Sequence, residues 1–183
     1  MQMQEHVETM YHDEEQGLTN LLERIYTDGY YRTAYEVQKG VGIGYSLMKL
    51  DKASVEKVVR KPWAQDGANF SSRIWKSKAD LVNKLHTDLT QAIILGKNPN
   101  TLTEGVAKRF DVSKSQASRL VNTEASFIYS ASTRDSYKEL GVEEYEILAT
   151  LDNKTSEICQ GMDGEHFPLS QYEIGITAPP FHP

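Results

Sequence analysis

The sequence predicts an α+β fold, in which a mostly helical body is followed by a small antiparallel β appendage at the C-terminus. Apolar residues recur at helical spacing as far as Gly141. From Tyr145 to Leu151 the pattern changes to alternation among strand-forming residues. We therefore expect three parts: a long amphipathic helix over residues 1–39, a helical body over 40–141, and a small β-rich motif over 142–183 that is truncated at its end.

The composition is that of a folded domain. The 183 residues are 39% hydrophobic and 25% charged, so the chain is long enough to bury a core. Its apolar runs are far shorter than the roughly 20 residues of a membrane span, and no signal peptide opens the chain. The single cysteine excludes an internal disulfide. We expect a soluble, cytosolic-type protein without a membrane partner.

An apolar stripe at helical spacing predicts the first helix. Its members are Val7, Met10, Tyr11, Leu18, Leu21, Leu22, Ile25, Tyr26, Tyr30, Tyr31, Ala34 and Tyr35. The run Gly40, Gly42 and Gly44 then breaks the helix, because a glycine inside a helix costs about 1 kcal/mol relative to alanine. This run follows a helix instead of a strand, so we interpret it as a hinge and not as a phosphate loop.

The helical body begins with Asp51, a predicted N-cap of a short helix through Arg60 that Pro62 ends. After the segment Asn69–Trp75 comes the firmest predicted helix, and Gly96 stands at its expected end. Its stripe is Leu81, Val82, Leu85, Leu89 and Ile93. The sequence Asn98-Pro99-Asn100 predicts a turn, after which Thr101 or Thr103 caps another short helix.

Residues 103–123 have the rhythm of a helix-turn-helix, in which Ser113 and Gln116 form a capping box that opens the second helix. A DNA-binding module is therefore one alternative, with Lys108, Arg109 and Lys114 facing nucleic acid. We favour two packed helices joined by a short turn, because the second helix runs to Gly141 and exceeds the usual length of a recognition helix.

In the C-terminal motif, Asp163-Gly164 predicts a hairpin turn with Glu165–Phe167 as the returning strand, and Asp152 caps a turn through Thr155 and Ser156. Cys159 and His182 are candidate ligands of an incomplete metal site. The alternative is a buried, inert Cys159. A structural zinc would therefore require further ligands.

Four segments taken in order resemble the phage Mu F-like minor head proteins, also called phage head morphogenesis proteins. They are Asn69–Trp75, Arg119–Glu124, the motif of Asp152, Thr155, Ser156, Cys159, Asp163, Gly164 and Phe167, and the terminal Pro179–Pro183. The resemblance implies a protein present in few copies inside the head, next to the portal and other capsid or scaffold proteins, with a part in assembly and in DNA ejection. It implies synthesis in the cytoplasm of the bacterial host.

The same resemblance implies that this chain is a central fragment. Members of the family have a further helical region before the equivalent of Met1 and a tail beyond the terminal His-Pro. The tail carries a cysteine that would complete a zinc site with Cys159 and His182.

An ejected effector enzyme is the other class that we consider. Arg73, Arg119, Glu124 and Asp152 are weak catalytic candidates for an ADP-ribosyltransferase or a nuclease. Their spacing fixes no mutual geometry, and the sequence contains no nucleophile elbow and no P-loop.

The charge is uneven: the net charge is −6, but residues 49–97 are basic and both ends are acidic. Such a basic stretch would give weak, salt-sensitive DNA contact, because its binding would depend on counterion release. Ordinary solvated helix faces are the alternative explanation.

Overall fold

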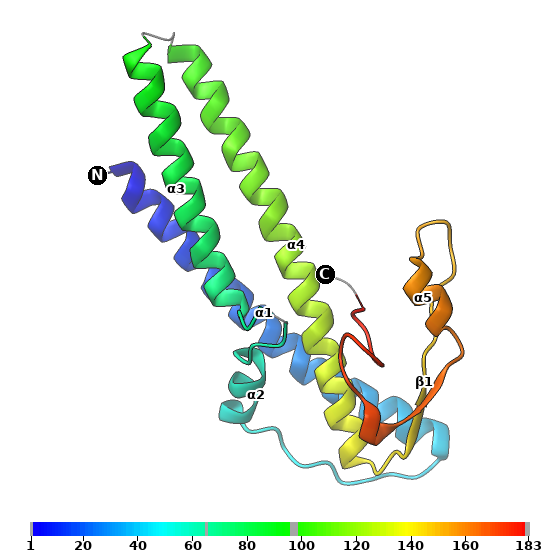
Figure 1. Ribbon diagram of the computed structural model, residues 1–183. Coiled ribbons are helices and arrows are strands. Elements are labelled where there is room, and N and C mark those ends of the chain that lie inside the picture. The colour runs from blue at the N-terminus through cyan, green and yellow to red at the C-terminus, as the bar shows by residue number, and fades with distance from the viewer. Residues whose placement is uncertain (1, 65, 96–98, 182–183) are drawn as a thin grey trace. The chain divides into compact units, whose positions relative to one another are not determined.

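The computed structural model describes residues 2–64, 66–95 and 99–181 (Figure 1). Its long helices are α1 (Gln2–Val41), α3 (Phe70–Ile94) and α4 (Pro99–Glu139), and α2 (Lys52–Val59) is short. Strands β1 (Glu144–Glu146) and β2 (His166–Pro168), helix α5 (Glu157–Met162) and the 3-10 turn η1 (Leu169–Gln171) follow. The predicted α+β class is therefore confirmed.

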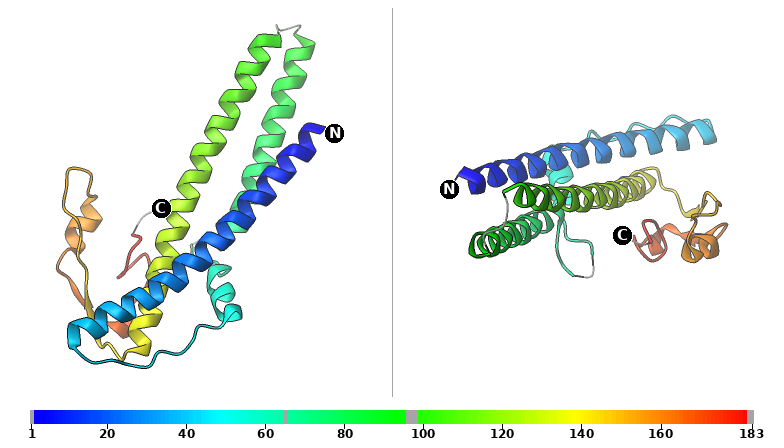
Figure 2. Two further views of the ribbon diagram at one scale, coloured as in Figure 1. Left: turned by 180° about the vertical axis from the view of Figure 1, so that it is seen from behind. Right: turned by 90° about the horizontal axis from the view of Figure 1, so that it is seen from above.

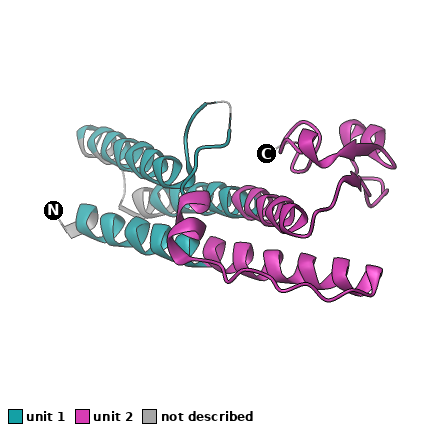
Figure 3. Cartoon of the chain, turned by 90° about the horizontal axis from the view of Figure 1, so that it is seen from below, with its two compact units in different colours: residues 1–20, 60–122 teal, residues 21–59, 123–183 magenta. Residues whose placement is uncertain are grey.

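The chain forms two compact units, each built from separate stretches of sequence (Figure 3). Unit 1 contains residues 1–20 and 60–122, and unit 2 contains residues 21–59 and 123–183. Helices α1 and α4 each contribute to both units. The division at residues 39 and 141 follows the sequence pattern and stays a prediction.

In unit 1, the first half of α1 packs with α3 and the first half of α4. The buried side chains are Val7, Tyr11, Leu18, Phe70, Ile74, Leu81 and Leu85. Polar contacts join the three helices around this core. Trp75 Nε1 donates to Glu15 Oε2 at 3.0 Å, Lys78 Nζ lies 2.8 Å from Glu8 Oε1, and the hydroxyls of Tyr11 and Ser113 lie 2.6 Å apart. The predicted stripe at Leu81 and Leu85 therefore faces a core, whereas Gly96 lies outside the described residues.

The segment Asn69–Trp75 forms the N-terminal cap and the first turns of α3. The Ser72 amide donates to Asn69 Oδ1 at 2.9 Å, and the Asn69 amide donates to Ser72 Oγ at 3.1 Å. This reciprocal pair is a capping box, which satisfies amides that the first helical turn leaves without partners. The segment is therefore the capped first turns of α3.

In unit 2, the second half of α1 packs against the second half of α4 at short range. Buried residues of both helices form the contact: Leu22, Tyr26, Tyr30 and Ala34 on α1, and Phe127, Ile128, Ala131, Ser132 and Ser136 on α4. A Cβ added at Gly29 would overlap Ser132 Oγ and lie 3.1 Å from Cδ2 of Tyr129. A larger residue at position 29 therefore requires the Ser132 side chain to shift.

Hydrogen bonds fix the relative rotation of these two helices in unit 2. The Tyr26 hydroxyl donates to Asp135 Oδ2 at 2.8 Å, and Arg134 Nε donates to Asp135 Oδ1 at 2.9 Å. Burial, and then the bond to the Asp135 carboxylate, raise the pKa of Tyr26. The tyrosine stripe predicted from the sequence divides, because Tyr26 and Tyr30 are buried while Tyr31 and Tyr35 are exposed.

The favoured prediction of two helices joined by a short turn and the helix-turn-helix alternative are both wrong, because α4 is continuous through residues 103–123 (Figures 1 and 2). No glycine or proline occurs between Val106 and Leu140 to interrupt it. The Ser113 hydroxyl, which was expected to cap a second helix, pairs with Tyr11 instead. Asn98 lies outside the described residues. The turn predicted at Pro99-Asn100 is wrong, because α4 begins at Pro99, and proline is favoured at the first position of a helix.

The predicted break after the first helix is confirmed, since α1 ends at Val41 and Gly42 has a φ of 68°. Residues 43–50 have no regular secondary structure. Asp51 caps α2 as predicted: its Oδ1 accepts from the Ala53 amide at 3.2 Å and its Oδ2 from the Ser54 amide at 3.0 Å. The hydrogen bond from the Ser54 hydroxyl to Oδ2, and then those from the two amides, lower the pKa of the Asp51 carboxyl.

The C-terminal appendage, residues 142–181, contains a two-stranded antiparallel sheet in which Tyr145 faces Phe167. The predicted alternation is confirmed only over β1, and Asp163-Gly164 is not a two-residue hairpin turn. Helix α5 comes between the two strands in the sequence. The Ser156 hydroxyl caps this helix by accepting a hydrogen bond from the Cys159 amide at 3.3 Å. Asp163 ends that helix, and Gly164, with a φ of 78°, turns the chain into β2.

The close approach at Gly29 gives a test with a matched control in the same helix. We expect Gly29→Ala to lower the free energy of unfolding by about 1–2 kcal/mol, because the new methyl group overpacks the contact with Ser132. Gly17 has no neighbouring atom near its added Cβ, so Gly17→Ala should raise that free energy by about 0.5–1 kcal/mol. Urea denaturation of both variants measures the difference, and equal stabilisation by the two alanines would contradict the packing.

Candidate functional site

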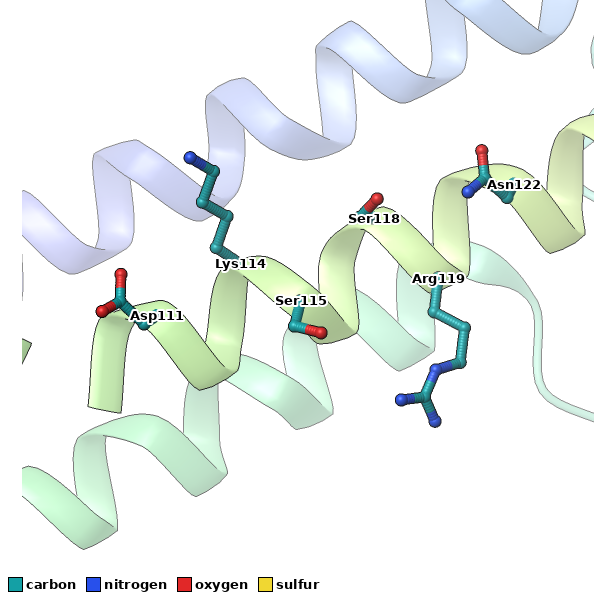
Figure 4. A pocket seen from close by; sticks show the side chains of 6 residues that line it. All are labelled: Asp111, Lys114, Ser115, Ser118, Arg119 and Asn122. Atoms are coloured by element: carbon teal, nitrogen blue, oxygen red, sulfur yellow. The ribbon is translucent and has the colours of Figure 1, made fainter. Parts of the chain in front are cut away.

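An open hollow of about 510 Å³ lies along the first half of α4, within unit 1 (Figure 4). Its lining comes entirely from this helix: Asp111, Lys114, Ser115, Ser118, Arg119 and Asn122. All six side chains are exposed and polar, and they carry two positive charges and one negative charge. Such a surface suits a polar or anionic partner better than an apolar small molecule.

The three residues predicted to face nucleic acid lie on the continuous helix and not at the start of a recognition helix. Lys108 and Lys114 are exposed. Arg109 instead forms an ion pair with Asp88 of α3, with 2.9 Å between Nε and Oδ2, and this hydrogen bond raises the pKa of Arg109. Only the two lysines therefore present their charge fully to solvent.

The four catalytic candidates are divided between the units. Arg73 and Arg119 belong to unit 1, whereas Glu124 and Asp152 belong to unit 2, so neither unit by itself holds the set. Arg73 contacts Asp66 Oδ1 at 2.7 Å and the Ala68 carbonyl at 2.8 Å, which fixes the loop before α3. Arg119 lines the hollow, and Glu124 is buried on α4.

Asp152 serves its own loop. Its Oδ1 accepts from the Lys154 amide at 2.8 Å, and its amide donates to Thr155 Oγ1 at 2.8 Å. Thr155 Oγ1 in turn donates to the Thr150 carbonyl at 2.8 Å. The predicted turn from Asp152 through Thr155 is therefore observed, and this carboxylate closes a loop by an Asx turn.

The remaining residues of the same motif also have local structural roles. Asp163 Oδ1 accepts from the Ala149 amide at 2.8 Å, and the Gly164 amide donates to the Ile147 carbonyl at 2.8 Å. The Phe167 ring lies 5.9 Å from the Tyr145 ring, measured between centroids. Together with the Ser156 cap, these contacts build the appendage.

The proposed zinc ligands are only partly described. Cys159 lies in the first turn of α5 and is half-buried, whereas His182 lies outside the described residues. Within residues 2–64, 66–95 and 99–181, no three His, Cys, Asp or Glu side chains gather in a way that would hold a metal ion. Cys159 is therefore the one predicted ligand that the structure places, and the zinc site stays a prediction that needs four ligands.

Sequence reasoning missed the residues that anchor the appendage to α4 within unit 2. The hydroxyls of Tyr172 and Ser130 lie 2.9 Å apart, and the Tyr172 ring packs 4.7 Å from the Tyr145 ring. Burial raises the pKa of Tyr172 to about 12. The Tyr145 hydroxyl donates to the Thr177 carbonyl at 2.9 Å. The one signal in the sequence was the presence of two tyrosines, Tyr145 and Tyr172, in the acidic C-terminal segment.

None of the described helices is both long enough and apolar enough to cross a membrane.

The sequence of this part of the chain matches a known family. The family model described as "Phage Mu protein F like protein" matches residues 83–183, which include the last part of α3, all of α4 and the appendage. No curated protein and no solved structure matches the chain.

The match covers 101 of the 183 residues, counted from 83 to 183, so the chain belongs to the phage Mu protein F-like family. The resemblance inferred from the motifs is thereby confirmed. The family indicates a bacteriophage protein of head morphogenesis.

Proposed function

We propose that this chain is a minor head protein that acts in head assembly inside the virion, next to the portal. The observation that carries the proposal is the family match over residues 83–183, a range that includes α4 and the appendage. The protein would be made in the cytoplasm of the bacterial host and enclosed with the head. Its place beside the portal would also give it a part in DNA ejection.

The hollow on α4 is the surface that we assign to the portal. It lies inside the matched region, and its exposed side chains are not part of the buried core of unit 1. Arginine is enriched among the residues that dominate protein interfaces, because its planar guanidinium makes several directed hydrogen bonds. Arg119 is therefore the residue whose loss should weaken the contact most.

A pull-down of the portal protein encoded in the same phage genome tests this assignment. We expect the full chain to retain the portal, and Arg119→Glu to weaken binding about tenfold or more, because a charge in the contact is reversed. Arg24→Glu is the matched control, since Arg24 is an exposed cation on α1 outside the matched region. Absence of portal binding by the unchanged chain would contradict the proposed function.

Exposed lysines on α4 support a second, weaker contact with the packaged DNA. Lys108 and Lys114 are exposed and lie six positions apart on one helix, whereas the neighbouring Arg109 is held by Asp88. Because the chain has a net charge of −6, such binding would be weak and would depend on local neutralisation of phosphates.

Fluorescence anisotropy with a duplex DNA, measured over a range of salt concentrations, tests the DNA contact. We expect Lys108→Gln together with Lys114→Gln to reduce the slope of log K against log salt by about two, since each lysine releases about one counterion. The control pair Lys138→Gln and Lys154→Gln, which are also exposed, should leave the slope unchanged. Binding that is absent at low salt, or that does not respond to salt, would exclude the contact.

A further inference from the structure

The segment between α1 and α2, residues 42–50, runs as an irregular stretch of chain between the two helices (Figure 1). Several of its apolar side chains are exposed. We call it the α1–α2 linker. After Gly42, the residues Ile43, Tyr45 and Leu47 occupy every second position, so in an extended strand they would share one face. Val41, Ile43, Tyr45 and Met48 are 57%, 54%, 48% and 70% exposed. Large apolar side chains gathered in this way are typical of an interaction surface.

The linker backbone is held mainly near its ends. The Ile43 amide donates to the Gln38 carbonyl at 3.3 Å, and the Leu50 amide donates to the Tyr31 hydroxyl at 3.1 Å. Between them, Gln38 Nε2 donates to the Tyr45 carbonyl at 3.3 Å. Within the described chain, no backbone hydrogen bond joins the linker to a strand. It has the alternation of a β-strand without the partner that a strand requires.

The appendage of the same chain offers a complementary strand edge. The Leu169 amide donates to the Glu143 carbonyl at 2.8 Å and the Ile147 amide to the Glu165 carbonyl at 2.9 Å. In an antiparallel pair these bonds alternate along the strand, so the amides and carbonyls of Glu144 and Glu146 point away from β2. The outer edge of β2 lacks one donor, because Pro168 has no amide hydrogen. The free edge of β1 is therefore the better template for a third strand.

The α1–α2 linker and the appendage carry opposite charges, and both expose apolar side chains. Residues 142–181 carry eight carboxylates and one lysine, a net charge of −7 with His166 neutral, and every one of these carboxylates is exposed. Residues 39–59 carry four lysines and two carboxylates, a net charge of +2, and all four lysines are exposed. Leu148, beside the β1 edge, is 79% exposed, and Leu151 is 60% exposed.

We propose that the α1–α2 linker of one copy of this chain adds as a third strand to the free edge of β1 in a second copy. A sheet of two strands is only marginally stable by itself, so a third strand would stabilise the appendage. At about 3.3 Å per residue the linker is longer than the β1 edge and spans it fully. Because the two surfaces differ, the contact is head-to-tail, and a pair of chains still has one free linker on one chain and one free edge on the other, so further chains can add and build multimers.

Sedimentation velocity of the full chain over a range of concentrations tests the proposal. We expect reversible self-association that weakens as salt rises, because opposite charges face each other. Two variants should each weaken it about tenfold or more: Ile43→Asp, which places a carboxylate opposite the acidic appendage, and Glu144→Lys with Glu146→Lys, which reverses the edge charge. Val112→Asp, at a similarly exposed residue of α4, should associate like the unchanged chain.

A mixture of the two variants with weakened self-association distinguishes this interface from other modes of association. The Ile43→Asp chain retains an intact β1 edge, and the Glu144→Lys, Glu146→Lys chain retains an apolar linker. We expect the mixture to form a one-to-one complex, because one intact surface remains on each chain. A monomeric unchanged chain at every concentration would mean that another protein covers the linker, and it would overturn the proposal. Failure of the mixture to associate would overturn it as well.

Discussion

The continuity of helix α4 is the constraint on which the rest of the structure depends. Its first half carries Ser113, which pairs with Tyr11 in unit 1, and its second half carries Ser132 and Asp135, which meet Gly29 and Tyr26 in unit 2. The absence of glycine and proline from Val106 to Leu140 therefore allows one helix to contribute to both units.

The appendage depends on the same helix, because Tyr172 bonds to Ser130 of α4. Its sheet is too small to supply a core, and Tyr145, Phe167 and Tyr172 instead pack their rings together beside the helix. The motif that resembles the family, from Asp152 to Phe167, consists mainly of groups that satisfy backbone amides within the loop. These contacts give the motif a structural part in the appendage.

The sequence predicted those elements whose causes are local. The caps at Asp51, the break at Gly42 and the alternation at Tyr145 each depend on residues a few positions apart. The errors arose where a distant partner decided the outcome. Ser113 was predicted to cap a helix because of its spacing from Gln116. Its hydroxyl instead pairs with that of Tyr11, 102 residues away, and no local pattern predicts this contact. The anchoring role of Tyr172 was missed for the same reason, since Ser130 lies 42 positions away.

The distance between spin labels at positions 108 and 122 tests the continuity of α4 most directly. With Cys159, the single native cysteine, replaced by serine, labelled cysteines at Lys108 and Asn122 would report on this stretch alone. A continuous helix places the two backbone positions about 21 Å apart, because fourteen residues rise by 1.5 Å each. Double electron–electron resonance should therefore give one narrow distribution near that distance. A distribution centred near about 15 Å, as two helices crossing after a turn would give, would contradict the account.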